Sequence, residues 1–280
     1  MKITLMLMLI TLVEGFVVNT PIRTYKKFID NNVVKVFEPY NIEKNQTSCI
    51  IFYTGANSLI PGEIYSDFIN KLASKNFSVH VSPNNQELSE DLVYQLTYEY
   101  REVIPVTHSS GCINAIKNCN KNRGIKKAIF MDPVDNRELL NTFGGYFNPL
   151  SFMNKKGEKA EKLKYMDNIL FLNAKKSYEW KFYPLTVPFI PGFTLKEDDI
   201  INDNCNVLKI EAMDFGHSDI LDNLWSDLMH GTISKGYEER DEEKLSEYRL
   251  WLCSIIYDYI NKGNIDDENI VEDINYKYLQ

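Results

Sequence analysis

Hydrophobic positions along the chain follow two spacings that take turns. Short apolar or alternating runs of β-branched and aromatic residues predict strands. Longer segments with apolar residues three and four apart predict helices, as in EIYSDFINKLASKN, where Ile64, Phe68, Ile69 and Leu72 share one side. The predicted strands cover residues 31–40, 49–55, 77–85, 103–106, 126–135, 168–174 and 206–214, and the predicted helices cover 63–76, 87–102, 112–120 and 242–260. Apolar strands alternating with helices indicate an α/β fold with a mostly parallel sheet covered on both faces.

Three residue types suited to nucleophilic catalysis stand at the ends of separate predicted strands. Ser109 follows the run 103–106 in THSSG, Asp132 ends the run AIFMD, and His217 lies in EAMDFGHSDILDN after the last strand. Functional groups of such sheets gather at the carboxyl ends of the strands. The order Ser, Asp, His is that of the catalytic triad in α/β-hydrolases, with Ser109 as nucleophile, Asp132 orienting the histidine and His217 as general base.

Each residue of the proposed triad has an alternative interpretation or a rival residue. THSSG lacks the first glycine of the G-x-S-x-G nucleophile elbow because Thr107 stands there, so Ser109 could also be an ordinary polar turn residue. Pro105 fits a central strand poorly because it cannot donate to the ladder. Asp135 is the rival of Asp132, three residues further into the loop. Among the other histidines, His80 lies within a strand pattern, His230 falls in a helix or at its end, and His108 beside the serine is expected to point away from it.

Four segments give the chain a family resemblance. FYTGANS with the segment behind it, THSSG, IFMDPVD and DFGHSDILDN are similar to the corresponding stretches of the chlorophyllases and their relatives among the α/β-hydrolases, over residues 45–225. The resemblance implies the same triad, Ser109, Asp132 and His217, and an oxyanion hole made by the backbone N–H groups of Ser110 and Ala56. Thr107, Thr54 and Cys112 depart from that family's pattern.

The N-terminus and the region after Asp132 suggest the domain plan. Residues 1–15 have the short apolar run of a signal peptide, with the mature domain spanning 16–280 and directed to a secretory route. The N-x-S/T triplets at Asn45 and Asn76 fit that route but also arise by chance in an asparagine-rich chain. A cap-like excursion around 136–167 could line an acyl pocket or pack on itself. Its apolar side chains include Phe143, Tyr146, Phe147, Phe152 and Met153.

Composition narrows the partners. The net charge of −8 argues against nucleic acid as a partner. The five cysteines show no metal-site spacing, so neither metal nor cofactor is expected, and Cys112 and Cys119 lie too far apart along one helix to form a disulfide. The leading hypothesis is a secreted ester hydrolase acting on a small-molecule or lipid ester, with membrane-surface contact left open. The alternative is a hydrolase fold that serves as a non-catalytic binding protein.

Overall fold

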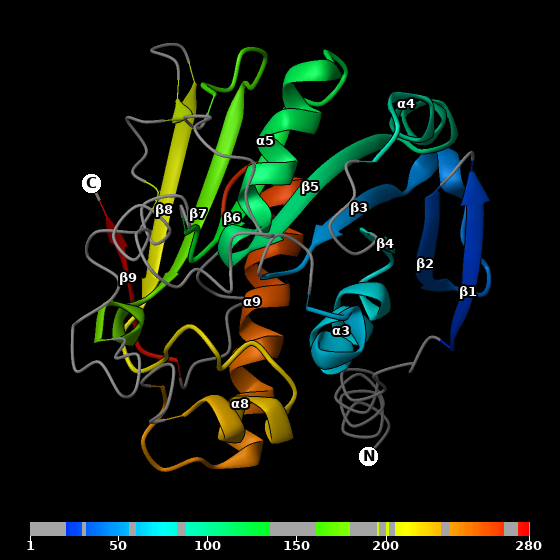
Figure 1. Ribbon diagram of the computed structural model, residues 1–280. Coiled ribbons are helices and arrows are strands. Elements are labelled where there is room, and N and C mark those ends of the chain that lie inside the picture. The colour runs from blue at the N-terminus through cyan, green and yellow to red at the C-terminus, as the bar shows by residue number, and fades with distance from the viewer. Residues whose placement is uncertain are drawn as a thin grey trace, which may run out of the picture.

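The described residues form one mixed sheet. The computed structural model describes residues 21–29, 32–55, 60–82, 88–134, 161–179, 195, 200–201, 205–230, 236–265 and 274–279. Within them the strand order is β1-β2-β4-β3-β5-β6-β7-β8-β9 (Figure 1). The strands are β1 (Ile22–Ile29), β2 (Asn32–Pro39), β3 (Ser48–Tyr53), β4 (Ser78–Val81), β5 (Glu102–His108), β6 (Lys127–Met131), β7 (Asn168–Ala174), β8 (Asn206–Ala212) and β9 (Tyr276–Leu279).

Pairing directions identify the fold. Strands β3 to β8 pair in parallel, whereas β2 runs antiparallel to both β1 and β4, and β9 runs antiparallel to β8. Strand β4 lies between β2 and β3, so the chain steps back toward β2 after β3 and then crosses to β5 on the other side of β3. An antiparallel second strand followed by this exchange and a parallel run is the strand order of the α/β-hydrolase fold. The predicted fold class is confirmed.

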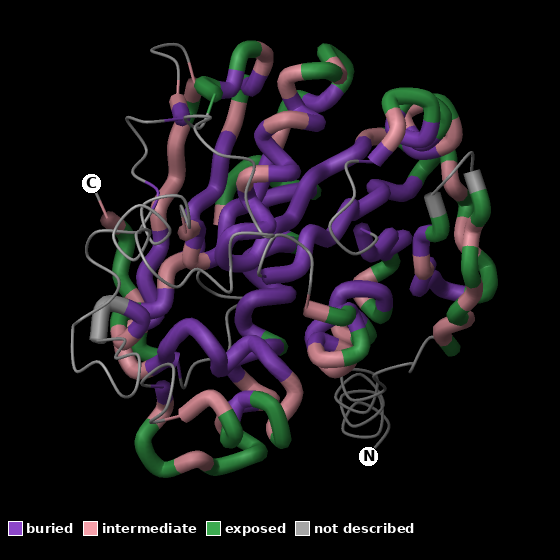
Figure 2. The backbone as a smooth tube through the Cα atoms, in the orientation of Figure 1, coloured by how far each residue is buried: buried purple, intermediate pink, exposed green. Residues whose placement is uncertain are grey.

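Helices cover both faces of the sheet, and alternate strand residues face each layer. On one face, α3 (Ser66–Ser74) and α9 (Glu242–Lys262) pack over Ile50 and Phe52 of β3. On the other, α4 (Glu90–Glu99) and α5 (Cys112–Lys121) pack over Ile51 and Tyr53. The central strands are therefore buried on both sides (Figure 2), which is why their sequences read as continuous apolar runs.

Most predicted elements are confirmed, and three were not predicted. Strands β1 and β9 and the short helix α8 (Asn223–Met229) have weaker apolar patterns because they lie at the edges of the sheet or on the surface. Pro105 does lie in a central strand. It is opposite Ile51 of β3, and the pairing of β5 with β6 begins only at the next residue, Val106.

Several predictions fall outside the described residues: the signal peptide, most of the excursion, Ala56 and Asp135. The last part of the excursion is described, and Leu163 and Met166 pack into the core on the α5 side. All five cysteines are described, and none forms a disulfide. Asn45 and Asn76 are exposed. Among the helices that the structure describes, none has the length and apolarity needed to cross a membrane.

Candidate active site

Ser109 stands on a strained turn between β5 and α5. Its φ is 55°, in the left-handed region that a serine adopts only at a cost, and the turn η3 (Ser109–Gly111) leads directly into α5. The turn presses against the end of β3: a Cβ on Gly111 would stand 2.5 Å from the carbonyl oxygen of Thr54 and 2.6 Å from that of Tyr53. Only glycine fits there, so sequence and geometry agree on a nucleophile-elbow shape.

Thr107 occupies a strand position rather than the turn. It lies in β5 opposite Tyr53 of β3 and Phe130 of β6, and its side chain is buried. Its hydroxyl has no hydrogen-bond partner among the described residues. The backbone is therefore too crowded for a side chain at Gly111 but not at Thr107, so β5 accommodates a threonine at the first glycine position of G-x-S-x-G.

Asp132 lies one residue beyond β6, with its carboxylate held from β7 and the turn after it. Its φ of 41° is one that aspartate tolerates better than most residues. Oδ1 accepts a hydrogen bond from the backbone N–H of Ala174 and Oδ2 one from the hydroxyl of Ser177, both at 2.8 Å. Burial raises the pKa of Asp132 to about 6, while the Ala174 and Ser177 hydrogen bonds oppose that rise. The carboxylate is fixed in place and is ionised at neutral pH and above.

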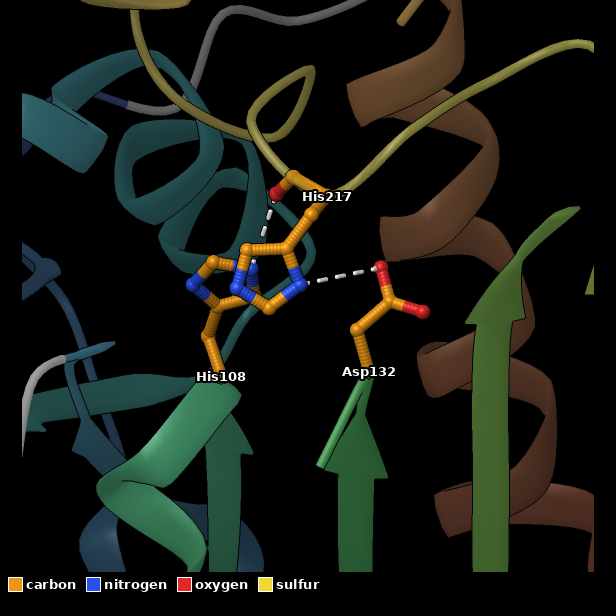
Figure 3. Close-up of side chains that lie close together, drawn as sticks. All are labelled: His108, Asp132 and His217. Atoms are coloured by element: carbon orange, nitrogen blue, oxygen red, sulfur yellow. Dashed lines mark hydrogen bonds and ion pairs between the residues drawn. The ribbon is translucent and has the colours of Figure 1, made fainter. Parts of the chain in front are cut away.

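His217 faces that carboxylate from the loop after β8 (Figure 3). Its Nδ1 lies 3.6 Å from Oδ2 of Asp132, which is ion-pair distance but longer than a good hydrogen bond. Burial lowers the pKa of His217 to about 3, so the ring is neutral at physiological pH. A neutral imidazole oriented by a carboxylate is the form required of a general base.

Asp219, two residues after His217, fastens the loop that carries it. The fully buried carboxylate accepts the backbone N–H of Gly216 at 2.9 Å and that of Tyr237 at 2.7 Å. It also pairs with Arg240 at 2.8 Å. These contacts give the SDILD part of the motif a structural task, which is to fix the loop on both sides of His217.

His108 packs against His217, although it precedes the serine in sequence. The two rings lie 4.4 Å apart at an angle of 37°, and Nε2 of His108 is 3.0 Å from the backbone oxygen of His217 (Figure 3). One ligand atom each from His108, Asp132 and His217 would lie within 4.8 Å of the others, so the group has the proximity of a metal site. Both nitrogens of His108 are engaged, however, since Nδ1 lies 2.8 Å from the hydroxyl of Tyr65. A metal ion would have to break one of these hydrogen bonds.

The predicted site residues are brought together in part. Asp132 and His217 face each other, and the backbone oxygen of Ser109 accepts from the N–H of Val134, two residues after Asp132, at 3.3 Å. The loop after β3 also reaches the serine, because a Cβ on Gly55 would stand 3.4 Å from that of Ser109. Ser110 is buried in the same turn, while Ala56 lies outside the described residues.

Comparison with known proteins gives only distant structural similarity. No family model matches the chain, and no curated protein matches it. Among solved structures, a candidate esterase from Staphylococcus aureus is similar with a TM-score of 0.39 at 15% identity, over 56% of this chain and 66% of that one. A thermostable esterase from Pseudomonas putida is similar with a TM-score of 0.40 at 9% identity, over 58% and 66%. The chain thus spans just under two thirds of these relatives, and the fold assignment rests on its own strand order.

Four residues around the site were not found by sequence reasoning. They are Tyr65, His108, Ser177 and Asp219. Tyr65 and Ser177 are joined to the site only by tertiary contacts, so no local pattern marks them. His108 adjoins Ser109 in THSSG, but it was expected to point away from the serine and was given no role. Asp219 lies in the GHSDILD segment that carries the family resemblance, but its contacts with Gly216 and Tyr237 are not visible in the sequence.

Proposed function

We propose that the protein is a serine-dependent carboxylic ester hydrolase. Ser109 attacks the ester carbonyl, His217 takes the serine proton and passes it to the leaving alcohol, and Asp132 orients His217 and stabilises the imidazolium. Water then hydrolyses the acyl-enzyme with His217 again as base. The backbone N–H groups of Ser110 and Ala56 bind the negative charge that develops on the carbonyl oxygen.

One observation carries the proposal. The strained Ser109 turn stands at the end of β5, beside the strand whose end bears Asp132, and Asp132 faces a neutral His217. An ordinary polar turn needs neither a left-handed serine nor a following glycine that no other residue could replace. A buried carboxylate with a raised pKa, paired with a buried histidine, is moreover a costly arrangement that is common at catalytic sites.

The proposed substrate is a small-molecule or lipid ester. The chlorophyllase resemblance supports ester chemistry, whereas chlorophyll itself does not suit a secreted protein. Export is part of the proposal, with residues 1–15 removed as a signal peptide. N-terminal sequencing of the chain recovered from its own cells and their medium should begin near Phe16. A chain found only inside the cells, with residues 1–15 still attached, would refute export.

Labelling with a fluorophosphonate probe tests the catalytic proposal. The probe reacts with a serine that a neighbouring base activates, so the adduct should be found on Ser109 by peptide mass spectrometry and should disappear in His217→Ala. Ser110→Ala is the matched control, because it removes the neighbouring hydroxyl but keeps the backbone N–H. If the folded wild-type protein gives no adduct, the binding-protein alternative is favoured instead.

A panel of nitrophenyl esters of increasing acyl length then defines the substrate class. Turnover that rises with chain length would indicate a lipase. Turnover confined to short chains would indicate an esterase.

A further inference from the structure

A continuous hydrogen-bond chain connects two loops of the candidate site through buried side chains. The backbone N–H of Gly55, where the loop after β3 begins, donates to the hydroxyl of Tyr65 at 3.1 Å. That hydroxyl lies 2.8 Å from Nδ1 of His108, whose Nε2 lies 3.0 Å from the backbone oxygen of His217. This series of hydrogen bonds therefore runs from Gly55, which precedes the expected oxyanion donor, to the backbone of the proposed general base.

Only one assignment of protons satisfies every member. The carbonyl of His217 can only accept, so Nε2 of His108 must carry a hydrogen. Burial lowers the pKa of His108 to about 3, so the ring is neutral and its Nδ1 must accept. Tyr65 then donates to Nδ1 and accepts from Gly55, which uses both capacities of its hydroxyl.

Packing holds the side chains of Tyr65 and His108 in place. Tyr65 has no exposed surface and His108 is 3% exposed. The Tyr65 ring meets His108 edge-on at 5.5 Å and Phe52 edge-on at 5.1 Å. The His108 ring in turn lies 4.4 Å from the His217 ring, tilted by 37°. Either side chain would lose its buried hydrogen bonds in any other position.

From this geometry we propose that Tyr65 and His108 are positioning residues for ester hydrolysis: Tyr65 fixes the tautomer of His108, and His108 holds the backbone and ring of His217 in register with Ser109. The inference rests on the proposed function above. The same hydroxyl accepts from the backbone N–H of Gly55, the last described residue before the expected oxyanion donor, so one relay of hydrogen bonds contacts both Gly55 and the base. A neutral His108 also spares the imidazolium formed at His217 a like charge at stacking distance.

The first test removes single hydrogen bonds and follows the rate of fluorophosphonate labelling at Ser109. Tyr65→Phe keeps the ring but removes the hydroxyl, and labelling should slow roughly tenfold, the effect of about one hydrogen bond. Tyr100→Phe is the matched control, because it removes another buried hydroxyl, one that bonds Ser78 instead of the site. Both variants should lose similar stability in urea, but only Tyr65→Phe should lose labelling rate. Equal labelling rates for the folded variants would overturn the proposal.

The second test exploits the geometry of His108. Glutamine can place an amide N–H near the position of Nε2, whereas leucine cannot. His108→Leu should slow labelling on the order of 100-fold, as expected for a displaced catalytic group, and His108→Gln should recover most of that loss. Adding Tyr65→Phe to His108→Leu should cost less than Tyr65→Phe costs alone, since the contact with His108 is already lost and only the hydrogen bond to Gly55 remains to be removed. If the losses of labelling rate in the two single variants multiplied in the double variant, the relay would be contradicted.

Nitrogen chemical shifts of the histidine rings make the test independent of activity. The wild-type protein should show His108 protonated at Nε2 and not at Nδ1, and Tyr65→Phe should shift the His217 ring nitrogens. If Ser109 is never labelled but these shifts are seen, the proposed function fails while the relay geometry stands. If His108 is protonated at Nδ1, the relay is wrong whether or not the serine reacts.

Discussion

Replacing Asp132 by asparagine should separate activity from stability. The amide keeps an oxygen for the N–H of Ala174, and its nitrogen can donate to the hydroxyl of Ser177, so both anchoring hydrogen bonds can persist. What disappears is the negative charge that faces Nδ1 of His217 at 3.6 Å. We expect the variant to fold and to lose catalysis.

The structure gives the size of both effects. A unit charge pair at 3.6 Å interacts by about 5 kcal/mol at an effective dielectric constant of about 20, so kcat/KM should fall on the order of 10³-fold. Stability should change in the opposite direction. Burial places the pKa of Asp132 near 6 against an ordinary value of 3.8, so its ionisation costs the fold up to about 3 kcal/mol above pH 6. That penalty fades as pH falls through 6 and is absent below 3.8. Asp132→Asn should therefore be more stable than wild type at pH 8 and similar at pH 4.

Two assays check the prediction. Hydrolysis of a short nitrophenyl ester gives kcat/KM, and urea unfolding at pH 8 and pH 4 gives the two stability differences. Asp135→Asn is the control, because it removes the rival carboxylate and should keep activity. An active Asp132→Asn together with an inactive Asp135→Asn would refute the assignment of the acid. A variant that is less stable at pH 8 than at pH 4, relative to wild type, would refute the account of the buried charge.

Three further predictions concern the support of the site. Gly111→Ala should destabilise the fold by about 1–3 kcal/mol in urea unfolding and abolish labelling, because its Cβ overlaps backbone oxygens; normal stability would contradict the elbow geometry. Ser177→Ala should move the acid limb of the pH–activity profile to higher pH. The hydroxyl of Ser177 holds the pKa of Asp132 down, so its loss should raise that pKa; a shift of the acid limb to lower pH would refute this. Asp219→Ala should cost about 3–5 kcal/mol in urea, because Arg240 and two backbone N–H groups lose their buried partner; a loss under about 1 kcal/mol would refute it.

Much of the fold could be predicted because the burial of strands and helices determines the spacing of apolar residues along the sequence. Strands β3 to β7 are covered on both faces, so their residues are mostly apolar, and helix α9 carries its apolar stripe over its whole length. The edge strands β1 and β9 were missed, because a strand with one exposed face shows a weaker pattern. Pro105 was predicted to fit a central strand poorly, because the sequence does not show the strand register. The pairing of β5 with β6 starts one residue later, at Val106.

The sequence alone is enough to place Ser109, Asp132 and His217 after separate strands and Gly111 in the turn that carries the serine. These are local facts, because a strand end is set by neighbours a few positions away. The contact between Asp132 and His217, and the connection from Gly55 through Tyr65 and His108 to the backbone of that histidine, are visible only in the folded chain. Those contacts join residues from 10 to 109 positions apart. They depend on the order in which the strands pair, and no local pattern of apolar and polar positions encodes that order.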